Sequence, residues 1–231
     1  MNRIKISCLM PAYNCAAYID VAVASIVQQT YNNWELLIVD DGSDDGTYEK
    51  SKAWADKDCR IRFQRIVHAG YAEAMNCAMS MASGDYIARQ DADDFCTADR
   101  LTKMMEFATV TGIATCQMIR VDADGKQLSG TREGTAMVCK DFLAGRAWGP
   151  PSITTVARRD ICEIAHPLRR KYSLTADSEW AIRVIKAGFT NWKHVKQPLY
   201  FYRQHDQQST KLFKHDAQQL HKELLAEAAH G

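Results

Sequence analysis

Three acidic residues with short spacing occur at positions 91–94, where the sequence reads Asp-Ala-Asp-Asp. Carboxylates at positions i and i+2 of a loop, here Asp91 and Asp93, can bind one hard divalent cation. Such a cation keeps some of its waters and takes phosphate oxygens of a substrate as further ligands. The same pattern also occurs in solvated turns that cap a helix. A location at the carboxyl end of a parallel strand favours the metal-binding interpretation.

A second acidic cluster lies at residues 40–46. Its last six positions fit the start of a calcium-binding EF-hand loop, but the twelfth position of that loop would be Lys52 rather than a bidentate glutamate. A calcium site is therefore excluded. We expect Asp44 and Asp45 to belong to a capped turn between a strand and a helix. Asp41 is nearer to the strand and is the better candidate for a contact to a base or a ribose.

The elements that must position these residues follow from the apolar periodicity. It predicts strands at 4–10, 35–40, 61–67 and 85–89, with helices at 16–29, from about 47, and at 71–82. This alternation implies a parallel sheet with helices on both faces. Ligands of such sheets bind at the carboxyl ends of the strands. Those ends carry Pro11-Ala12-Tyr13-Asn14, Asp40-Asp41-Gly42-Ser43, His68-Ala69-Gly70 and Asp91-Ala92-Asp93-Asp94.

Several common catalytic motifs are absent from the sequence. It contains no G-x-x-x-x-G-K-[ST], no G-x-G-x-x-G, no H-E-x-x-H and no G-x-S-x-G. The P-loop, common dinucleotide-binding, zinc-protease and α/β-hydrolase interpretations therefore lose their usual support.

The motifs that are present occur in a recognisable order: Pro11–Asn14, Val39–Ser43, Gly84–Ile87 and Asp91–Asp94. This ordered set resembles glycosyltransferase family 2, the inverting nucleotide-sugar transferases with a GT-A fold. Further similarity at 175–180 and 202–205 extends the resemblance to about residue 209.

The resemblance implies roles for the residues of the first half. Pro11 and Tyr13 would line the nucleobase pocket, with Tyr13 stacking on the base. Asp41 would accept a hydrogen bond from the base. Asp91 would contact the nucleoside, and Asp93 would hold Mn²⁺ or Mg²⁺ on the diphosphate.

The resemblance also implies roles in the second half. His205 would reach the metal or the diphosphate, although it could also be a surface histidine. Asp177 resembles the catalytic base, although it could merely cap a helix. The base often belongs to a Glu-Asp pair in this family, whereas Ala176 precedes Asp177 here. Glu179 is a rival base, and only one of the two carboxylates should face the site.

The Gln-x-x-Arg-Trp signature of processive members is missing, which favours a single-addition transferase. The expected donor is a UDP-sugar and the expected acceptor is a glycan or a lipid-linked glycan in surface polysaccharide synthesis. The alternative is a non-catalytic module that binds nucleotide sugar, which Ala176 supports. A nucleotidyltransferase would need a Gly-rich loop after the first strand, and residues 11–14 are not one.

Composition narrows the possible partners. With 29 Lys+Arg and 28 Asp+Glu, the net charge is +1, which is not the footprint of a nucleic-acid-binding protein. The 8 cysteines show no C-x-x-C spacing, and no export signal or spanning segment is evident, so we expect a cytoplasmic protein whose cysteines are buried.

Arg169–Lys171 is interpreted as a solvated run, with contact to anionic phosphate or a membrane as its functional alternative. The sequence also allows a predicted helix at 211–228 with several lysines to touch acidic lipid at the inner face of a membrane.

Together these patterns predict one α/β domain with a GT-A-like, Rossmann-like, mostly parallel sheet. Residues 1–100 would bind the nucleotide, residues 101–210 would bind the acceptor, and residues 211–231 would form a C-terminal helix.

Overall fold

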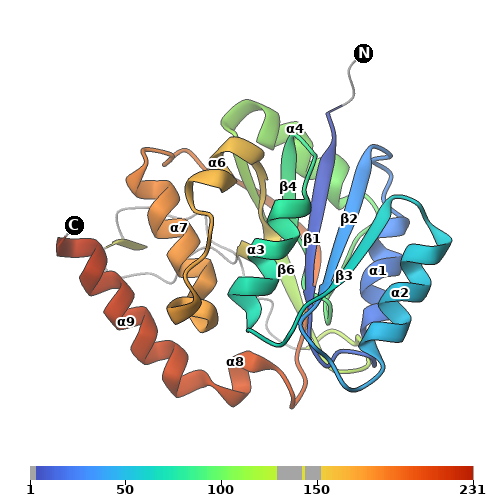
Figure 1. The fold of residues 1–231 in the computed structure, drawn as a ribbon. Coiled ribbons are helices and arrows are strands. Elements are labelled where there is room, and N and C mark those ends of the chain that lie inside the picture. Colours follow the sequence, from blue (N-terminus) through green and yellow to red (C-terminus); the bar gives the residue numbers. More distant parts are fainter. Residues whose placement is uncertain (1–3, 129–141, 144–151, 231) are drawn as a thin grey trace.

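The computed structural model describes residues 4–128, 142–143 and 152–230 (Figure 1). The strands are β1 (Ile6–Ala12), β2 (Trp34–Asp40), β3 (Ile61–Arg65), β4 (Tyr86–Arg89), β5 (Phe95–Cys96), β6 (Ile113–Val121), β7 (Val156–Arg158) and β8 (Lys193–Arg203). The helices are α1 (Ile19–Val27), α2 (Thr47–Lys57), α3 (Tyr71–Met81), α4 (Arg100–Thr111), α6 (Arg159–Ile164), α7 (Ala176–Lys186), α8 (Ser209–Leu212) and α9 (Lys214–His230). Two 3-10 helices, η1 (Ser152–Thr154) and η2 (Arg170–Thr175), precede β7 and α7.

In this part of the chain, eight strands form one sheet with the order β3-β2-β1-β4-β7-β6-β8-β5. The first four strands are parallel, as the sequence predicts. The rest of the sheet is mixed, because β7 runs antiparallel to both β4 and β6, and β5 runs antiparallel to β8. Strands as short as β5 and β7 carry no periodicity of their own, so the sequence analysis missed both. The α/β class with helices on both faces is confirmed.

Two apolar cores cover the two faces of the sheet. Successive residues of β2 point to opposite faces, so Leu36 and Ile38 join one core while Leu37 and Val39 join the other. The first core is completed by α1 and α4, and the second by α3, α6 and α7. Figure 1 shows α3 and α7 on one side of the sheet and α1 on the other. In the described part of the chain, apolar residues therefore cover both faces of the sheet.

Three details differ from the sequence-based expectation. The first helix begins at Ile19 rather than at residue 16. The backbone N–H of Cys15 donates to Oγ1 of Thr47, the first residue of α2, and that of Ala16 donates to Asp45 in the loop before α2. The expected C-terminal helix is divided into α8 and α9 at Phe213. Most described cysteines are buried as expected, but Cys59 is exposed and Cys77 is half-buried, and Cys139 lies outside the described residues.

Within the described ranges, none of the helices combines the length and the apolar character that crossing a membrane requires. The C-terminal helix α9 instead packs against η2 and α7. Arg169, just before η2, and Lys171, within η2, both form ion pairs with Glu227 of α9. The hydroxyl of Tyr172 also donates a hydrogen bond to Glu227. The segment that leads into α7 is thus tied to the end of the chain.

Candidate active site

The loops after β1 and β2 bind each other at the carboxyl edge of the sheet. The backbone N–H of Asn14 donates to Oγ of Ser43 at 3.0 Å, and the backbone N–H of Asp44 donates to Oδ1 of Asn14 at 3.1 Å. Gly42 has a φ of +72°, and a Cβ on it would come within 2.9 Å of the backbone nitrogen of His68. The third loop, after β3, can therefore approach only because residue 42 is a glycine.

Tyr13 and His68 form an exposed aromatic pair at this edge. Their ring centroids are 4.2 Å apart with an interplanar angle of 23°, and Tyr13 is 50% exposed. An aromatic residue that served only to pack would be covered, so this ring is available to stack on a planar ligand. Pro11 is buried near the end of β1, in register with Val39 of β2.

Asp41 lies beneath the aromatic pair and is almost completely buried. Its two carboxylate oxygens accept hydrogen bonds from the backbone N–H groups of Ala69 and Gly70, at 2.8 and 2.9 Å. Nδ1 of His68 lies 2.9 Å from the same carboxylate. Asp41 therefore has a role that the sequence analysis did not assign, which is to fix the loop that carries His68.

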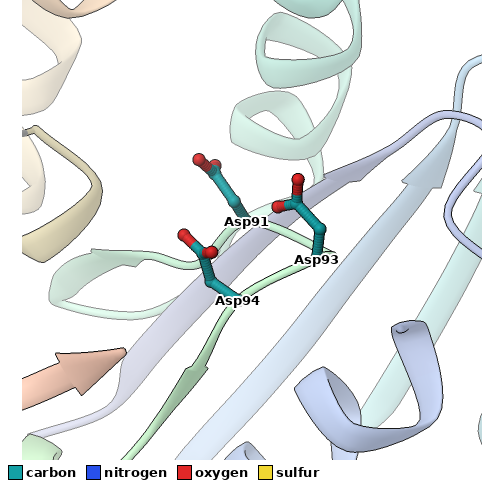
Figure 2. Close-up of side chains that lie close together, drawn as sticks. All are labelled: Asp91, Asp93 and Asp94. Carbon is teal, nitrogen blue, oxygen red and sulfur yellow. The ribbon is translucent and has the colours of Figure 1, made fainter. Parts of the chain in front are cut away.

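The carboxylates of Asp91, Asp93 and Asp94 gather at one side of the loop that follows β4, as Figure 2 shows. One oxygen from each lies within 4.8 Å of the others. Burial, together with the charges of Asp93 and Asp177, raises the pKa of Asp91 to about 7. Burial, together with the charges of Asp93 and Asp91, raises the pKa of Asp94 well above its usual value. The raised pKa values show that the basic groups nearby do not fully offset the negative charge of these three carboxylates.

The strand β8 brings His205 to this acidic cluster. Nε2 of His205 lies 3.0 Å from Oδ2 of Asp93, and the imidazole is only 9% exposed, so the surface-histidine alternative is wrong. Arg203, the last residue of β8, also contacts the acidic loop. Its backbone N–H donates to Oδ1 of Asp94 at 2.7 Å, and its Nε donates to the backbone oxygen of Asp93 at 2.7 Å.

The residues of this cluster fit a hard divalent cation. Oδ2 of Asp94 is buried and has no hydrogen-bond partner among the described residues. Orphaned carboxylate oxygens and mutual repulsion among three acids are both relieved by a cation, and oxygen donors with one imidazole suit Mn²⁺ or Mg²⁺. The sequence-based interpretation of the acidic loop as a metal site is compatible with this geometry.

Asp177 lies at the start of α7 and reaches the same edge of the sheet. Thr175 is the N-cap residue of α7, so Asp177 belongs to the first turn and is not the cap. Its Oδ1 lies 3.1 Å from Nη2 of Arg89, the last residue of β4, and its side chain is 41% exposed. The hydroxyl of Tyr71 accepts a hydrogen bond from the same Nη2 at 2.6 Å and donates to Oδ1 of Asp91 at 3.4 Å. Asp177 is therefore joined to the acidic cluster.

Glu179, the rival base, faces away from this edge. Its carboxylate is completely buried and accepts hydrogen bonds from Nε and the backbone N–H of Arg169, at 2.7 and 3.0 Å. Nη1 of Arg183 is 3.6 Å away. Glu179 is a structural carboxylate, and Arg169 is its partner rather than part of a freely solvated run.

Sequence reasoning missed four residues that shape the site: Tyr71, Arg89, Arg203 and, as an aromatic partner, His68. A signal existed for Arg89, because a charged residue ends the otherwise apolar run Tyr86-Ile87-Ala88. A buried charge is costly unless it is paired, so such a residue points to an acidic partner. The identity of that partner, Asp177, depends on the tertiary structure.

The mixed sheet with helices on both faces and an acidic loop at its carboxyl edge is a GT-A-like fold, and comparison with known proteins identifies the family. Residues 7–161 match the profile of Glycosyl transferase family 2, so the chain belongs to this family. The chain is 40% identical over 102 residues to UDP-Glc:alpha-D-GlcNAc-diphosphoundecaprenol beta-1,3-glucosyltransferase WfgD of Escherichia coli, a match that covers 44% of this chain and 40% of WfgD. The matched segment spans about two fifths of the length of the curated relatives.

Solved structures share the fold at low sequence identity. TarS 1-349 of S. aureus in complex with UDP-GlcNAc superposes with a TM-score of 0.77 at 16% identity, covering 97% of this chain and 66% of that one. The mannosyltransferase PcManGT of Pyrobaculum calidifontis, in complex with GDP-Man and Mn²⁺, gives a TM-score of 0.64 at 20% identity and covers 88% of this chain and 57% of that one.

Proposed function

We propose that this chain transfers one sugar from a nucleotide-sugar, with a UDP-sugar as the expected donor, to a hydroxyl group of a glycan or lipid-linked acceptor. The anomeric configuration would invert, and a divalent cation would be required. Residues 1–100 would bind the donor, and residues 101–210 would complete the site on the acceptor side.

The observation that carries this proposal is the link between Asp177 and the acidic loop. Asp177 contacts Arg89, Arg89 contacts the Tyr71 hydroxyl, and this hydroxyl contacts Asp91. A carboxylate with 41% of its side chain exposed thus lies beside the residues assigned to the donor. This placement suits a single displacement, in which the base takes the proton of the acceptor hydroxyl while that oxygen and the leaving group share the same anomeric carbon.

In the proposed reaction, Asp177 takes the proton of the acceptor hydroxyl as that oxygen attacks the anomeric carbon. The new carbon–oxygen bond forms while the bond to the diphosphate breaks, and its electron pair leaves with the nucleoside diphosphate. Inversion follows from a single attack opposite the leaving group. Tyr13 would hold the nucleobase. Asp41, which also fixes the loop that carries His68, would accept a hydrogen bond from the base.

Asp93 and His205 are the residues proposed to hold the cation, with Asp91 oriented toward the nucleoside. A bound Mn²⁺ or Mg²⁺ would offset the charge that grows on the departing diphosphate. The complex of PcManGT with Mn²⁺ supports this choice of metal.

Two similarities support the choice of substrates. The name of WfgD specifies a UDP-Glc donor and a diphosphoundecaprenol-linked acceptor, and TarS was solved with UDP-GlcNAc. We therefore place this chain in the synthesis of a bacterial surface polysaccharide. The absence of Gln-x-x-Arg-Trp from the sequence supports a single addition rather than processive synthesis.

We also propose a peripheral contact with anionic membrane at the junction of α8 and α9. Leu212 and Phe213 are 60% and 45% exposed there, between the exposed Lys211 and Lys214. Apolar side chains flanked by lysines suit the interface of a membrane that contains acidic lipid. This surface would bring the active site to a lipid-linked acceptor.

The testing experiment is calorimetric titration with UDP, GDP and CDP, each with and without Mn²⁺. We expect Mn²⁺-dependent binding of UDP, which Asp93→Ala abolishes and Asp216→Ala, a change of an exposed acid on α9, leaves intact. Incubation of the corresponding nucleotide-sugars then measures release of nucleoside diphosphate. No binding of any nucleotide by folded protein would overturn the proposal. Binding without turnover, unaffected by Asp177→Asn, would instead support the non-catalytic sugar-nucleotide module.

A further inference from the structure

Arg89 is a charged residue in an otherwise apolar setting. Its side chain is only 6% exposed, and the space beside it is lined mainly by apolar residues, including Leu9, Ile87 and Trp180. Burial opposes the charged form, but Tyr71 and the carboxylates of Asp177 and Asp91 raise the pKa of Arg89 above its usual value. The guanidinium therefore stays charged.

An apolar residue would fill this position at lower cost than a guanidinium. Burying a charge requires good partners, and replacing buried ion pairs by apolar residues is often neutral or stabilising. Packing alone therefore does not account for an arginine at position 89. Two of its partners, Asp177 at 3.1 Å and the Tyr71 hydroxyl at 2.6 Å, are the proposed base and a group that contacts Asp91 of the acidic loop.

The two partners of Arg89 belong to different parts of the fold. Tyr71 begins α3 and contacts Asp91 of the acidic loop, whereas Asp177 lies in the first turn of α7. Arg89 itself ends β4, and the backbone N–H of Arg89 donates to the backbone oxygen of Thr155 at 3.2 Å. A central strand is a more rigid support than a helix end whose acidic side chain is 41% exposed.

We propose that Arg89 is a positioning residue, which orients the carboxylate of Asp177 toward the acceptor hydroxyl and links it through the Tyr71 hydroxyl to Asp91. This inference rests on the proposed function, in which Asp177 is the base. A misplacement of the base by about 1 Å can lower the rate about 100-fold. Without Arg89, the side chain of Asp177 would sample several rotamers, and the repulsion from Asp91 would turn it away.

The test compares kcat and KM of Arg89→Met, Arg89→Lys and Tyr71→Phe for nucleoside-diphosphate release. It is run with the acceptor found for the wild-type chain and again with water as acceptor. We expect Arg89→Met to lower kcat by about 10- to 100-fold, with the donor KM and the calorimetric Kd for the nucleotide changed by less than about 3-fold. Arg89→Lys should recover part of the loss, and Tyr71→Phe should cost less than Arg89→Met.

Arg100→Met is the matched control for loss of a buried arginine. Arg100 is completely buried, and its guanidinium donates to Gln90 and to the backbone oxygens of Arg89 and Ile153. We expect this variant to lower the Tm without a selective loss of kcat in the folded protein.

A double-mutant comparison separates positioning from general damage. If Arg89 acts through Asp177, then Arg89→Met should change kcat little in an Asp177→Asn background. The inference would be overturned if Arg89→Met lowered kcat by the same factor in the wild-type and Asp177→Asn backgrounds. It would also be overturned if Arg89→Met lowered kcat and nucleotide affinity equally. Turnover that depends on Asp177 but is unaffected by Arg89→Met would overturn the inference alone. No turnover by the wild-type chain, or full turnover by Asp177→Asn, would overturn the proposed function as well.

Discussion

Glu179 forms a buried ion pair with Arg169, whose Nε lies 2.7 Å from the Glu179 carboxylate. Asp177, two residues earlier on the same helix, faces Arg89 instead. Side chains two positions apart on an α-helix point roughly 200° apart, so one faces the site and the other faces the interior. The two acids that the sequence left as rivals thus have different physical environments.

This difference predicts opposite effects of two substitutions. Asp177→Asn removes the proposed base and should lower kcat by at least about 100-fold, with nucleotide affinity unchanged. Glu179→Gln weakens the pairing of Arg169 and should destabilise the fold by about 2 kcal/mol while kcat of the folded protein stays near that of the wild type. Steady-state kinetics and urea unfolding measure the two effects, and a reversed pattern would assign the base to Glu179.

Tyr13 should contribute directly to nucleotide affinity. Stacking of a base on an aromatic side chain is worth about 1–3 kcal/mol, so Tyr13→Ala should raise the Kd for the nucleotide by about 5- to 150-fold. Tyr13→Phe keeps the ring and should bind nearly as the wild type does. Calorimetric titration in the presence of Mn²⁺ provides the measurement. Unchanged affinity in the alanine variant would show that the base lies elsewhere.

His205 should determine how much metal the enzyme needs. Its imidazole lies 3.0 Å from Asp93, so His205→Ala should raise the Mn²⁺ concentration for half-maximal activity by about 10-fold or more. His194→Ala is the matched control, because His194 lies at the other end of β8 and contacts Thr115. Equal responses of the two variants would contradict a metal-binding role for His205.

Glu35 should make stability depend on pH. Burial opposes ionisation of Glu35, but hydrogen bonds from Ser7, Ser83 and Lys5 outweigh it and lower the pKa from 4.5 to about 2. The stabilisation is therefore complete above pH 4.5 and is lost as the pH falls toward 2. Glu35→Gln should lower the free energy of unfolding at pH 7 by roughly 1–3 kcal/mol, and this deficit should shrink below pH 4.5.

Urea unfolding at several pH values between 7 and 3 would follow that deficit. Glu106→Gln, a change of an exposed acid on α4, is the control and should differ from the wild type by less than about 0.5 kcal/mol throughout. A deficit for Glu35→Gln that grows on acidification would have the wrong sign for a depressed pKa.

The proposed membrane surface can be tested by vesicle sedimentation. The double variant Leu212→Ser, Phe213→Ser should bind phosphatidylglycerol-containing vesicles at least about 10-fold more weakly than the wild type, because two apolar side chains no longer insert. Val110→Ser, which changes a side chain that is 81% exposed on α4, should have no effect. Equal wild-type binding to pure phosphatidylcholine, or none to either vesicle, would contradict an acidic-lipid contact.

Much of the structure of residues 1–100 could be predicted from local patterns. The apolar run at 35–40 lies within β2 (Trp34–Asp40), and the predicted strand at 85–89 contains β4 (Tyr86–Arg89). Because parallel strands align their carboxyl ends, the order of strands and loops also placed Tyr13, Asp41, Asp91 and Asp93 at one edge.

The structure beyond residue 100 depended on contacts that no local pattern encodes. The strand β7 pairs between β4 and β6 although it is only three residues long. The surroundings of Asp177 are set by Arg89, at the end of β4. Those of Glu179 are set by Arg169, in the segment before η2. The spacing of Asp177 and Glu179 shows that their side chains point in different directions on α7. It does not show which of the two faces the proposed ligand.

By itself, the sequence determined the α/β alternation, the edge of the sheet at which chemistry is concentrated and the residue types available there. Only the tertiary structure decided which carboxylate is exposed beside Arg89, which histidine meets Asp93, and that Asp41 holds a loop. The physical reason is that periodicity and turn chemistry act over a few neighbouring residues. The partner of a buried charge is instead set by the packing of elements distant in the chain, and by the cost of leaving that charge unpaired.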